Sequence, residues 1–296
     1  MPLLGEFSAL LTACCWSGSA LAFSAAAVRI GPIRLNVTRL VFAAVLLLCT
    51  VALTGAELQL STSQLANLAL SGMVGLVFGD TFLFKAYEYI GPRLSMLIMS
   101  AAPIVGAVVA YGVLGEVIGW FGILGMMVTL GGIAIVVLER RESFSLPNTY
   151  YGVGIFYGFL GAVGQGVALV LAKMAFNEGA VNGFVASLVR IAAAVVVIYP
   201  LAKLTGRYEN IVRVFLQDRK ALLLTVLGAF LGPFLGITLS LIAVMYTTVG
   251  IAATLMATVP IMMLPLVRII YRERLSWKAI AGAFLAVGGV AALFLR

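Results

Sequence analysis

Ten long apolar runs follow one another along the 296-residue chain, and they constrain its fold more than any other feature. A helix needs about 20 predominantly apolar residues to cross the hydrocarbon core of a bilayer. The runs are 7–28, 35–53, 64–90, 94–114, 119–138, 151–176, 182–202, 221–246, 249–271 and 276–295. Hydrophobic residues make up 63% of the chain and charged residues 10%, which is too little polar surface for a soluble domain of this size. The sequence therefore predicts an all-α integral membrane protein with ten transmembrane helices.

An internal repeat relates the two halves of the chain, because a shift of 157 residues aligns 70–139 with 227–296 without a gap. The alignment pairs residues that chance hydrophobic similarity does not readily supply: Pro103 with Pro260, Glu116 with Glu273, Trp120 with Trp277, and Gly131-Gly132 with Gly288-Gly289. We infer two five-helix units, 1–142 and 150–296. Five is odd, so the second unit enters the membrane from the opposite side. Inverted repeats of this kind recur in secondary transporters, with a site between the halves.

The basic residues gather in alternate connections between the apolar runs. Fourteen lie on one side: Arg29, Arg34, Arg93, Arg140, Arg141, Lys203, Arg207, Arg213, Arg219, Lys220, Arg268, Arg272, Arg274 and Lys278. The other side has only Lys173 and Arg296. The positive-inside rule then predicts a multi-pass protein of a bacterial-type plasma membrane, with both termini outside. Orientation signals in short loops also explain the net charge of +8, so nucleic acid is not an expected partner.

The inventory of reactive residues argues against an enzyme. The chain has no histidine, which excludes a Ser–His dyad, an HExxH zinc motif and a histidine proton relay. Gly79-Asp80 lacks the earlier glycine of a GxGD pair, and no Walker A sequence is present. We therefore expect no catalytic residue, no metal and no cofactor. The expected partners are a small-molecule substrate and the lipid bilayer.

Two duplicated blocks carry a family resemblance, and each is followed by a glycine-rich closing run that ends in Gly131-Gly132 or Gly288-Gly289. The blocks are Ala102-Pro103-Ile104 to Leu114-Gly115-Glu116, and Val259-Pro260-Ile261 to Arg272-Glu273-Arg274-Leu275. In this order they resemble the EamA family of the drug/metabolite transporter superfamily, over essentially the whole chain. Arg39 and Arg190 look like the arginine commonly found early in the second helix of each half.

The resemblance implies ten helices around a central cavity and export, or sometimes import, of amino acids or related metabolites. It also implies cytoplasmic termini, which is the opposite of the charge distribution, and we follow the charges. The alternatives are an intramembrane enzyme, which fails on the inventory above, and a flippase for a lipid-linked group. A flippase favours a laterally open cavity more basic than Arg39, Lys85 and Arg190 provide.

Asp80 is the one acid deep inside a predicted span, where an ionisable side chain costs about 2.5–3.5 kcal/mol on insertion scales. It can bind a substrate ammonium group or shuttle a proton, which makes protons the candidate coupling ion. The structural alternative is an ion pair with Arg39. Tyr87, seven residues on, shares the same helix face.

Arg190 also lies near mid-span, where it can neutralise a substrate carboxylate or pair with Glu116, as Arg39 can with Glu273. Lys85 and Glu88 are three residues apart, and we interpret them as a local ion pair. Glu116 and Glu273 each precede a closing helix, where an acid stabilises the helix N-terminus.

The remaining candidates for the substrate pathway are uncharged. Pro103 and Pro260 occupy matching positions and predict bent helices, because proline removes a backbone donor. Trp16 and Ser19 belong to a mixed aromatic and hydroxyl stripe on the first helix, for which both a cavity lining and core packing are open. Gln165 is the sole carboxamide deep in a span and would be costly without a partner.

Overall fold

A computed structural model of the chain describes residues 3–139, 151–206, 208, 211–259, 261–263, 265–266 and 276–294. Within these ranges the regular structure is entirely helical. The helices are α1 (Leu4–Ile30), α2 (Pro32–Thr54), α3 (Thr62–Gly72), η1 (Met73–Gly79), α4 (Asp80–Met99), α5 (Ala102–Leu114), α6 (Trp120–Glu139), α7 (Tyr151–Asn177), α8 (Gly183–Leu204), α9 (Ile211–Gln217), α10 (Arg219–Ala229), η3 (Phe230–Gly236), α11 (Ile237–Tyr246), α12 (Val249–Met256) and α14 (Trp277–Phe294).

Six helical stretches of the described chain are long and apolar enough to cross a membrane: Leu4–Ala27, Pro32–Thr54, Thr62–Tyr87, Gly152–Asn177, Gly183–Leu204 and Arg219–Tyr246. Four further apolar helical stretches are shorter: Ala102–Leu114, Trp120–Ile135, Val249–Met263 and Ile280–Gly289. Each of the ten overlaps one of the apolar runs in the sequence. The protein is therefore a multi-pass membrane protein whose described residues form helices only, with six clear spans and shorter apolar helices beside them.

The first half contains a helix break where the sequence did not predict one. The apolar runs predict an interruption at residues 91–93, but α4 continues to Met99 and the break falls at Ser100 and Ala101. Pro103 explains the position, since it has no N–H to donate to the carbonyl of Met99. The helix restarts instead with Ile104 N and Val105 N donating to Ala101 O. Pro103 thus lies in the first turn of α5, where proline is well tolerated, and not in the middle of a bent helix.

Irregular backbone recurs at the 157-residue shift found in the sequence. The π-helical segment η1 spans Met73–Gly79, and its counterpart η3 spans Phe230–Gly236. The break at residues 100–101 is likewise matched at residues 257–258, where Thr258 N donates to Leu255 O and Ile261 N donates to Thr258 O. π-Helical insertions and helix breaks are frequent at functional sites. Each half therefore has a π-helical segment and a helix break at equivalent positions.

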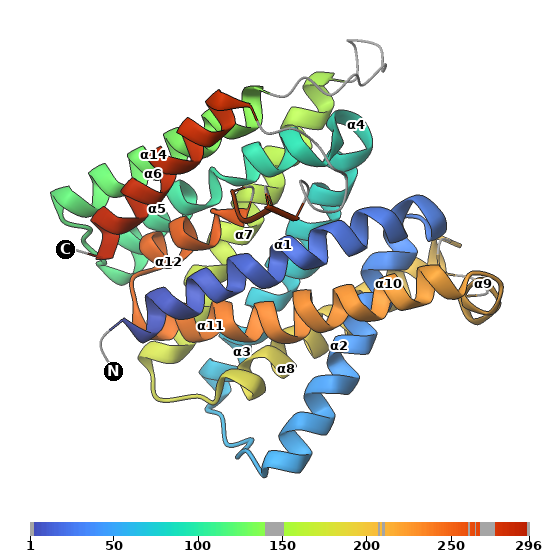
Figure 1. The fold of residues 1–296 in the computed structure, drawn as a ribbon. Coiled ribbons are helices and arrows are strands. Elements are labelled where there is room, and N and C mark those ends of the chain that lie inside the picture. The colour runs from blue at the N-terminus through green and yellow to red at the C-terminus, as the bar shows by residue number, and fades with distance from the viewer. Residues whose placement is uncertain are drawn as a thin grey trace.

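The contacts between helices follow the internal repeat: a contact made by one helix recurs when each helix is replaced by its counterpart in the other half. α1 packs against α10, η3 and α11, while its counterpart α7 packs against α3, η1 and α4. α2 packs against α8, α5 against α12, and α6 against α14. Figure 1 shows α1 lying along α10 and α11, and α14 beside α6 at the edge of the bundle. Such a repeated pattern of contacts is expected of a chain built from two copies of one unit.

The α6–α14 pair depends on one glycine of each Gly-Gly dipeptide. A Cβ on Gly132 would lie 2.5 Å from Ala286 N, and a Cβ on Gly289 would lie 2.5 Å from Thr129 N. A Cβ on Gly131 or Gly288 would meet nothing within 4 Å. Close backbone approach through small residues is a principal way in which helices associate in a membrane. The second glycine of each pair therefore makes the contact.

We expect Gly132→Leu to separate α6 from α14 and to destabilise the protein by about 1–3 kcal/mol, the usual cost of overpacking. The matched change Gly131→Leu should leave stability unchanged, because that position is open. Thermal unfolding of the purified variants in detergent, followed by size-exclusion chromatography, compares the two. Equal midpoints for both variants would contradict this packing.

Candidate functional site

A cavity of about 180 Å³ lies among helices of both halves. Seven of the eight residues predicted for a substrate pathway line it: Trp16, Ser19, Asp80, Tyr87, Pro103, Gln165 and Arg190. The eighth, Pro260, lies outside the described residues, although its neighbour Val259 is in the lining. The lining includes Ser100 and Ala257, one from each helix break. It also includes Leu76 and Gly232, one from each π-helical segment. The irregular backbone of the two halves thus converges on one cavity.

Both carboxylate oxygens of Asp80 accept hydrogen bonds from neighbouring side chains. Arg39 on α2 donates through Nη2 to Oδ2, forming an ion pair in which both side chains are about nine-tenths buried. Gln165 on α7 donates through Nε2 to Oδ1 over 2.8 Å, and to the carbonyl of Gly75 in η1 over 3.1 Å. Gln165 therefore links Asp80 to the irregular backbone of η1. Because its amide group donates two hydrogen bonds, Gln165 avoids the cost of a buried carboxamide without a partner.

Arg39 makes further contacts besides its ion pair with Asp80. Its Nε donates to Asn36 Oδ1 over 3.0 Å, and its Cζ atom lies 4.9 Å from the ring centroid of Phe84 and 5.3 Å from that of Phe23. Arginine stacked on aromatic faces keeps its charge with less loss of hydration than lysine does. Arg39 and Asp80 are thus an enclosed, mutually neutralising pair on the cavity wall.

Arg190 on α8 has no such partner. It is 2% exposed, it lines the cavity, and its Nε has no hydrogen-bond partner among the described residues. Within the described chain, no acid forms an ion pair with it, and Asp80 acts on it only at longer electrostatic range. The expected pair with Glu116 is not formed. Arg190 is seven residues into α8, which is about 10 Å along the helix, whereas Glu116 lies in the α5–α6 connection.

Other predicted roles turn out differently. Glu116 was expected to cap the closing helix that follows it, but its Oε2 accepts from Val249 N at the start of α12, 2.8 Å away. The Lys85 Nζ atom lies 5.4 Å from the ring centroid of Tyr157 and 5.7 Å from that of Phe82. The side chain of Glu88, and the whole of Glu273, lie outside the described residues. The proposed Lys85–Glu88 pair therefore remains a prediction.

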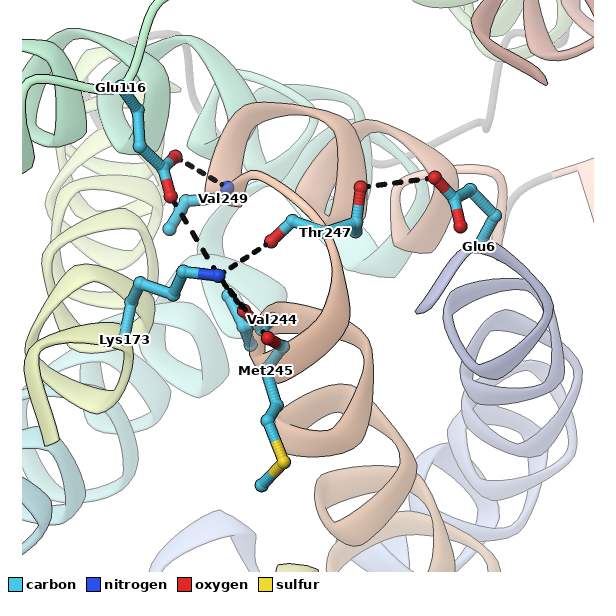
Figure 2. A network of polar contacts seen from close by, with 7 residues as sticks. All are labelled: Glu6, Glu116, Lys173, Val244, Met245, Thr247 and Val249. Carbon is cyan, nitrogen blue, oxygen red and sulfur yellow. Dashed lines mark hydrogen bonds and ion pairs between the residues drawn. The ribbon is translucent and has the colours of Figure 1, made fainter. Parts of the chain in front are cut away.

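The end of the bundle where α1 begins is closed by a polar network, shown in Figure 2. Lys173, near the end of α7, donates to the carbonyls of Val244 (2.6 Å), Met245 (3.4 Å) and Thr247 (3.0 Å). Its Nζ also lies 4.0 Å from Glu116 Oε1. A cation suits the C-terminus of a helix, and here it satisfies the last carbonyls of α11.

The same network reaches α12 and α1. Glu116 accepts from Val249 N, and Thr247 Oγ1 donates to Glu6 Oε1 over 3.1 Å. We call these contacts of Glu6, Glu116, Lys173, Thr247 and Val249 the Lys173 network. It joins α1, the α5–α6 connection, α7 and the α11–α12 turn (Figure 2).

An apolar cluster fills the space between this network and the cavity. It includes Ala9, Val244, Val249, Ile251 and Leu255, each with 0% exposure, and Trp16, Leu169, Ala253 and Met256, which also line the cavity. The cluster continues through Leu114 and Ile118 to the α5–α6 connection. Over the described residues, the cavity is therefore closed toward the end of the bundle where α1 begins, which we call the N-terminal end of the bundle.

Sequence reasoning missed Lys173 as a structural centre. The distribution of charges identifies it only as one of two basic residues on the sparsely charged side. A single cation in an otherwise apolar helix, on the side that the basic residues avoid, is the signal that marks it. Its partners are mainly backbone carbonyls, which no residue pattern displays.

Comparisons with known proteins agree with this architecture. The family model described as the EamA-like transporter family matches residues 3–138 and again residues 152–295. Among the solved structures that match, one described as "Crystal structure of protein" aligns with a TM-score of 0.82 at 18% sequence identity, covering 100% of this chain and 98% of that one. At that identity the likeness establishes the fold. No curated protein matched the chain.

Proposed function

The chain belongs to the EamA-like transporter family, and we propose that it carries a small metabolite across the membrane by alternating access to the cavity described above. Membership of the family makes it a membrane transporter of small molecules. The observation that supports alternating access is a charged cavity between the two halves that is sealed at one end of the bundle.

The helix breaks and π-helical segments at the cavity wall support the same mechanism. They occur at equivalent positions in the two halves, so each half brings similarly broken helices to the cavity. Transporters built from inverted repeats commonly bind their substrate at discontinuous helices near the midplane and rock one repeat against the other. We propose that these breaks are where the halves bend as the Lys173 network opens.

The finer assignments rest on the residues and on the family. The leading substrate class is an amino acid or a related compound, moved outward. Protons are the candidate coupling ion, with Asp80 as the acid in the described cavity wall. From the distribution of basic residues we propose that the Lys173 network faces the outside, and that the membrane is a bacterial-type plasma membrane.

Flux through vesicles reconstituted with the purified protein tests the proposal. A panel of radiolabelled amino acids and their deaminated and acylated relatives is assayed with and without a pH gradient. Ala20→Trp, which fills the cavity wall, should abolish flux, whereas Leu204→Trp, on an 85% exposed side chain, should not. Flux through none of the panel, or full flux through the Ala20→Trp variant, would remove the proposal.

A further inference from the structure

The charges on the cavity wall do not balance. Among the described lining residues, the ionised side chains are Arg39, Asp80 and Arg190. Arg39 and Asp80 neutralise each other through their ion pair. Arginine keeps its proton under all ordinary conditions, so one positive charge, on Arg190, is left over. A buried charge without a counter-ion is strongly unfavourable, so the wall residues by themselves favour a bound anion.

The position of Arg190 is built into the packing of α8. A Cβ on Gly72 would collide with the backbone of Arg190, and a Cβ on Gly75 would lie 3.3 Å from Arg190 Nη2. The two glycines therefore let α8 approach α3 and η1 and leave room for the guanidinium beside the irregular backbone. With 2% exposure and an unpartnered Nε, the side chain is fixed in the wall with hydrogen-bonding capacity unused.

From these observations we propose that the substrate is a monoanionic carboxylate without a free ammonium group, and that Arg190 anchors its carboxylate. The inference rests on the transport function proposed above and, within the class of amino acids and related compounds, selects the related compounds that have no ammonium group. A planar guanidinium binds a carboxylate through two parallel hydrogen bonds, which supplies geometry as well as charge. The bound carboxylate removes the leftover positive charge.

A zwitterionic amino acid fits this wall less well. Its net charge is zero, so the cavity would keep its unbalanced cation. Its ammonium group would also compete with Arg39 and Gln165 for the oxygens of Asp80, each of which already accepts one hydrogen bond. The rest of the wall is largely apolar and includes Leu76, Leu83, Phe84, Met96 and Met99. That surface suits a short hydrocarbon chain attached to the carboxylate.

Binding to the purified protein in detergent tests the charge preference directly. Trp16 lines the cavity, whereas Trp120 and Trp277 are 69% and 76% exposed, so Trp120→Phe with Trp277→Phe leaves Trp16 as the reporter. The probes share one 3-methylbutyl chain and differ in the charged groups on it: 4-methylpentanoate is the anion, leucine the zwitterion and 3-methylbutylamine the cation. We expect saturable quenching by the anion, with an affinity about tenfold or more above that of leucine, and none by the amine.

Arg190 itself is tested in the same background. Arg190→Gln should weaken binding of 4-methylpentanoate about tenfold or more, and Arg190→Lys should restore part of it. Equal affinity for leucine and the anion in the parent protein overturns the proposal, and so does no response to the anion. Titration with sodium chloride in a buffer free of chloride and carboxylates adds one more outcome. Saturation by chloride that leaves the carboxylate without effect would also overturn it.

Vesicle flux separates this inference from the transport proposal. Flux of leucine without flux of the anion would leave the protein a transporter and remove the anion preference. Binding of the anion with no flux of any probe would keep the site and remove transport.

Discussion

Replacing Asp80 with alanine is expected to destabilise the protein by about 3–5 kcal/mol, the usual cost of breaking a buried ion pair from one side. The acid is the counter-ion of Arg39, and its other oxygen accepts from Gln165. Without it, two arginines would face the cavity with no acid among the described lining residues. The effect should therefore exceed that of removing an ordinary polar side chain of the same size.

Two companion variants show whether charge is the cause. Asp80→Asn keeps the shape but removes the counter-ion, so it should remain substantially destabilised. Combining Arg39→Leu with Asp80→Leu removes both charges and should recover stability relative to Asp80→Ala. Thermal unfolding in detergent measures all three. If the double variant is less stable than Asp80→Ala, the explanation by an unpaired charge is wrong.

Replacing Lys173 with methionine is expected to open the cavity toward the N-terminal end of the bundle. The change leaves the carbonyls of Val244, Met245 and Thr247 and the carboxylate of Glu116 without their shared cation. Hydrogen bonds to charged groups are worth about 1.5–3 kcal/mol each. Loss of even one such bond should raise the population of the opened state about tenfold or more.

A single cysteine on the cavity wall reports this opening. Ala253 is 4% exposed and belongs to both the cavity and the apolar cluster, so Ala253→Cys is placed in a background lacking Cys14, Cys15 and Cys49. Its reaction with a membrane-impermeant maleimide in intact cells should accelerate about tenfold in Lys173→Met. Lys203→Met, which alters a lysine beside Tyr199 on α8, is the control. The same acceleration in both variants would mean that the network does not hold this end closed.

The helical membrane fold followed from the sequence because length and hydrophobicity determine which segments can cross a bilayer. The internal shift of 157 residues also relates the irregular segments of the two halves to each other, but nothing in the sequence showed where they lie or that they are π-helical. The break at Ser100 and Ala101 was misplaced by about eight residues, because Gly91-Pro92 is the stronger turn signal locally. The effect of Pro103 on the carbonyl before it was underestimated.

The site was predictable where burial is costly. Asp80, Gln165 and Arg190 stand out as polar groups in apolar runs, and all three line one cavity. Their partners depend on tertiary contacts, so the sequence left open whether Arg190 pairs with Glu116. The Lys173 network escaped prediction because its acceptors are the main-chain carbonyls of an ordinary apolar helix end.

The central claim is that one cavity serves both sides of the membrane in turn, and access of a cavity cysteine from each side tests it most directly. In the cysteine-free background, Gln59→Cys in the α2–α3 connection and Gln217→Cys in α9 serve as markers of the two sides. We predict that Gln59→Cys reacts with the impermeant maleimide only in intact cells and Gln217→Cys only in inverted vesicles. Ala20→Cys, on the cavity wall, should react in both preparations. Reaction of Ala20→Cys from one side alone would contradict alternating access.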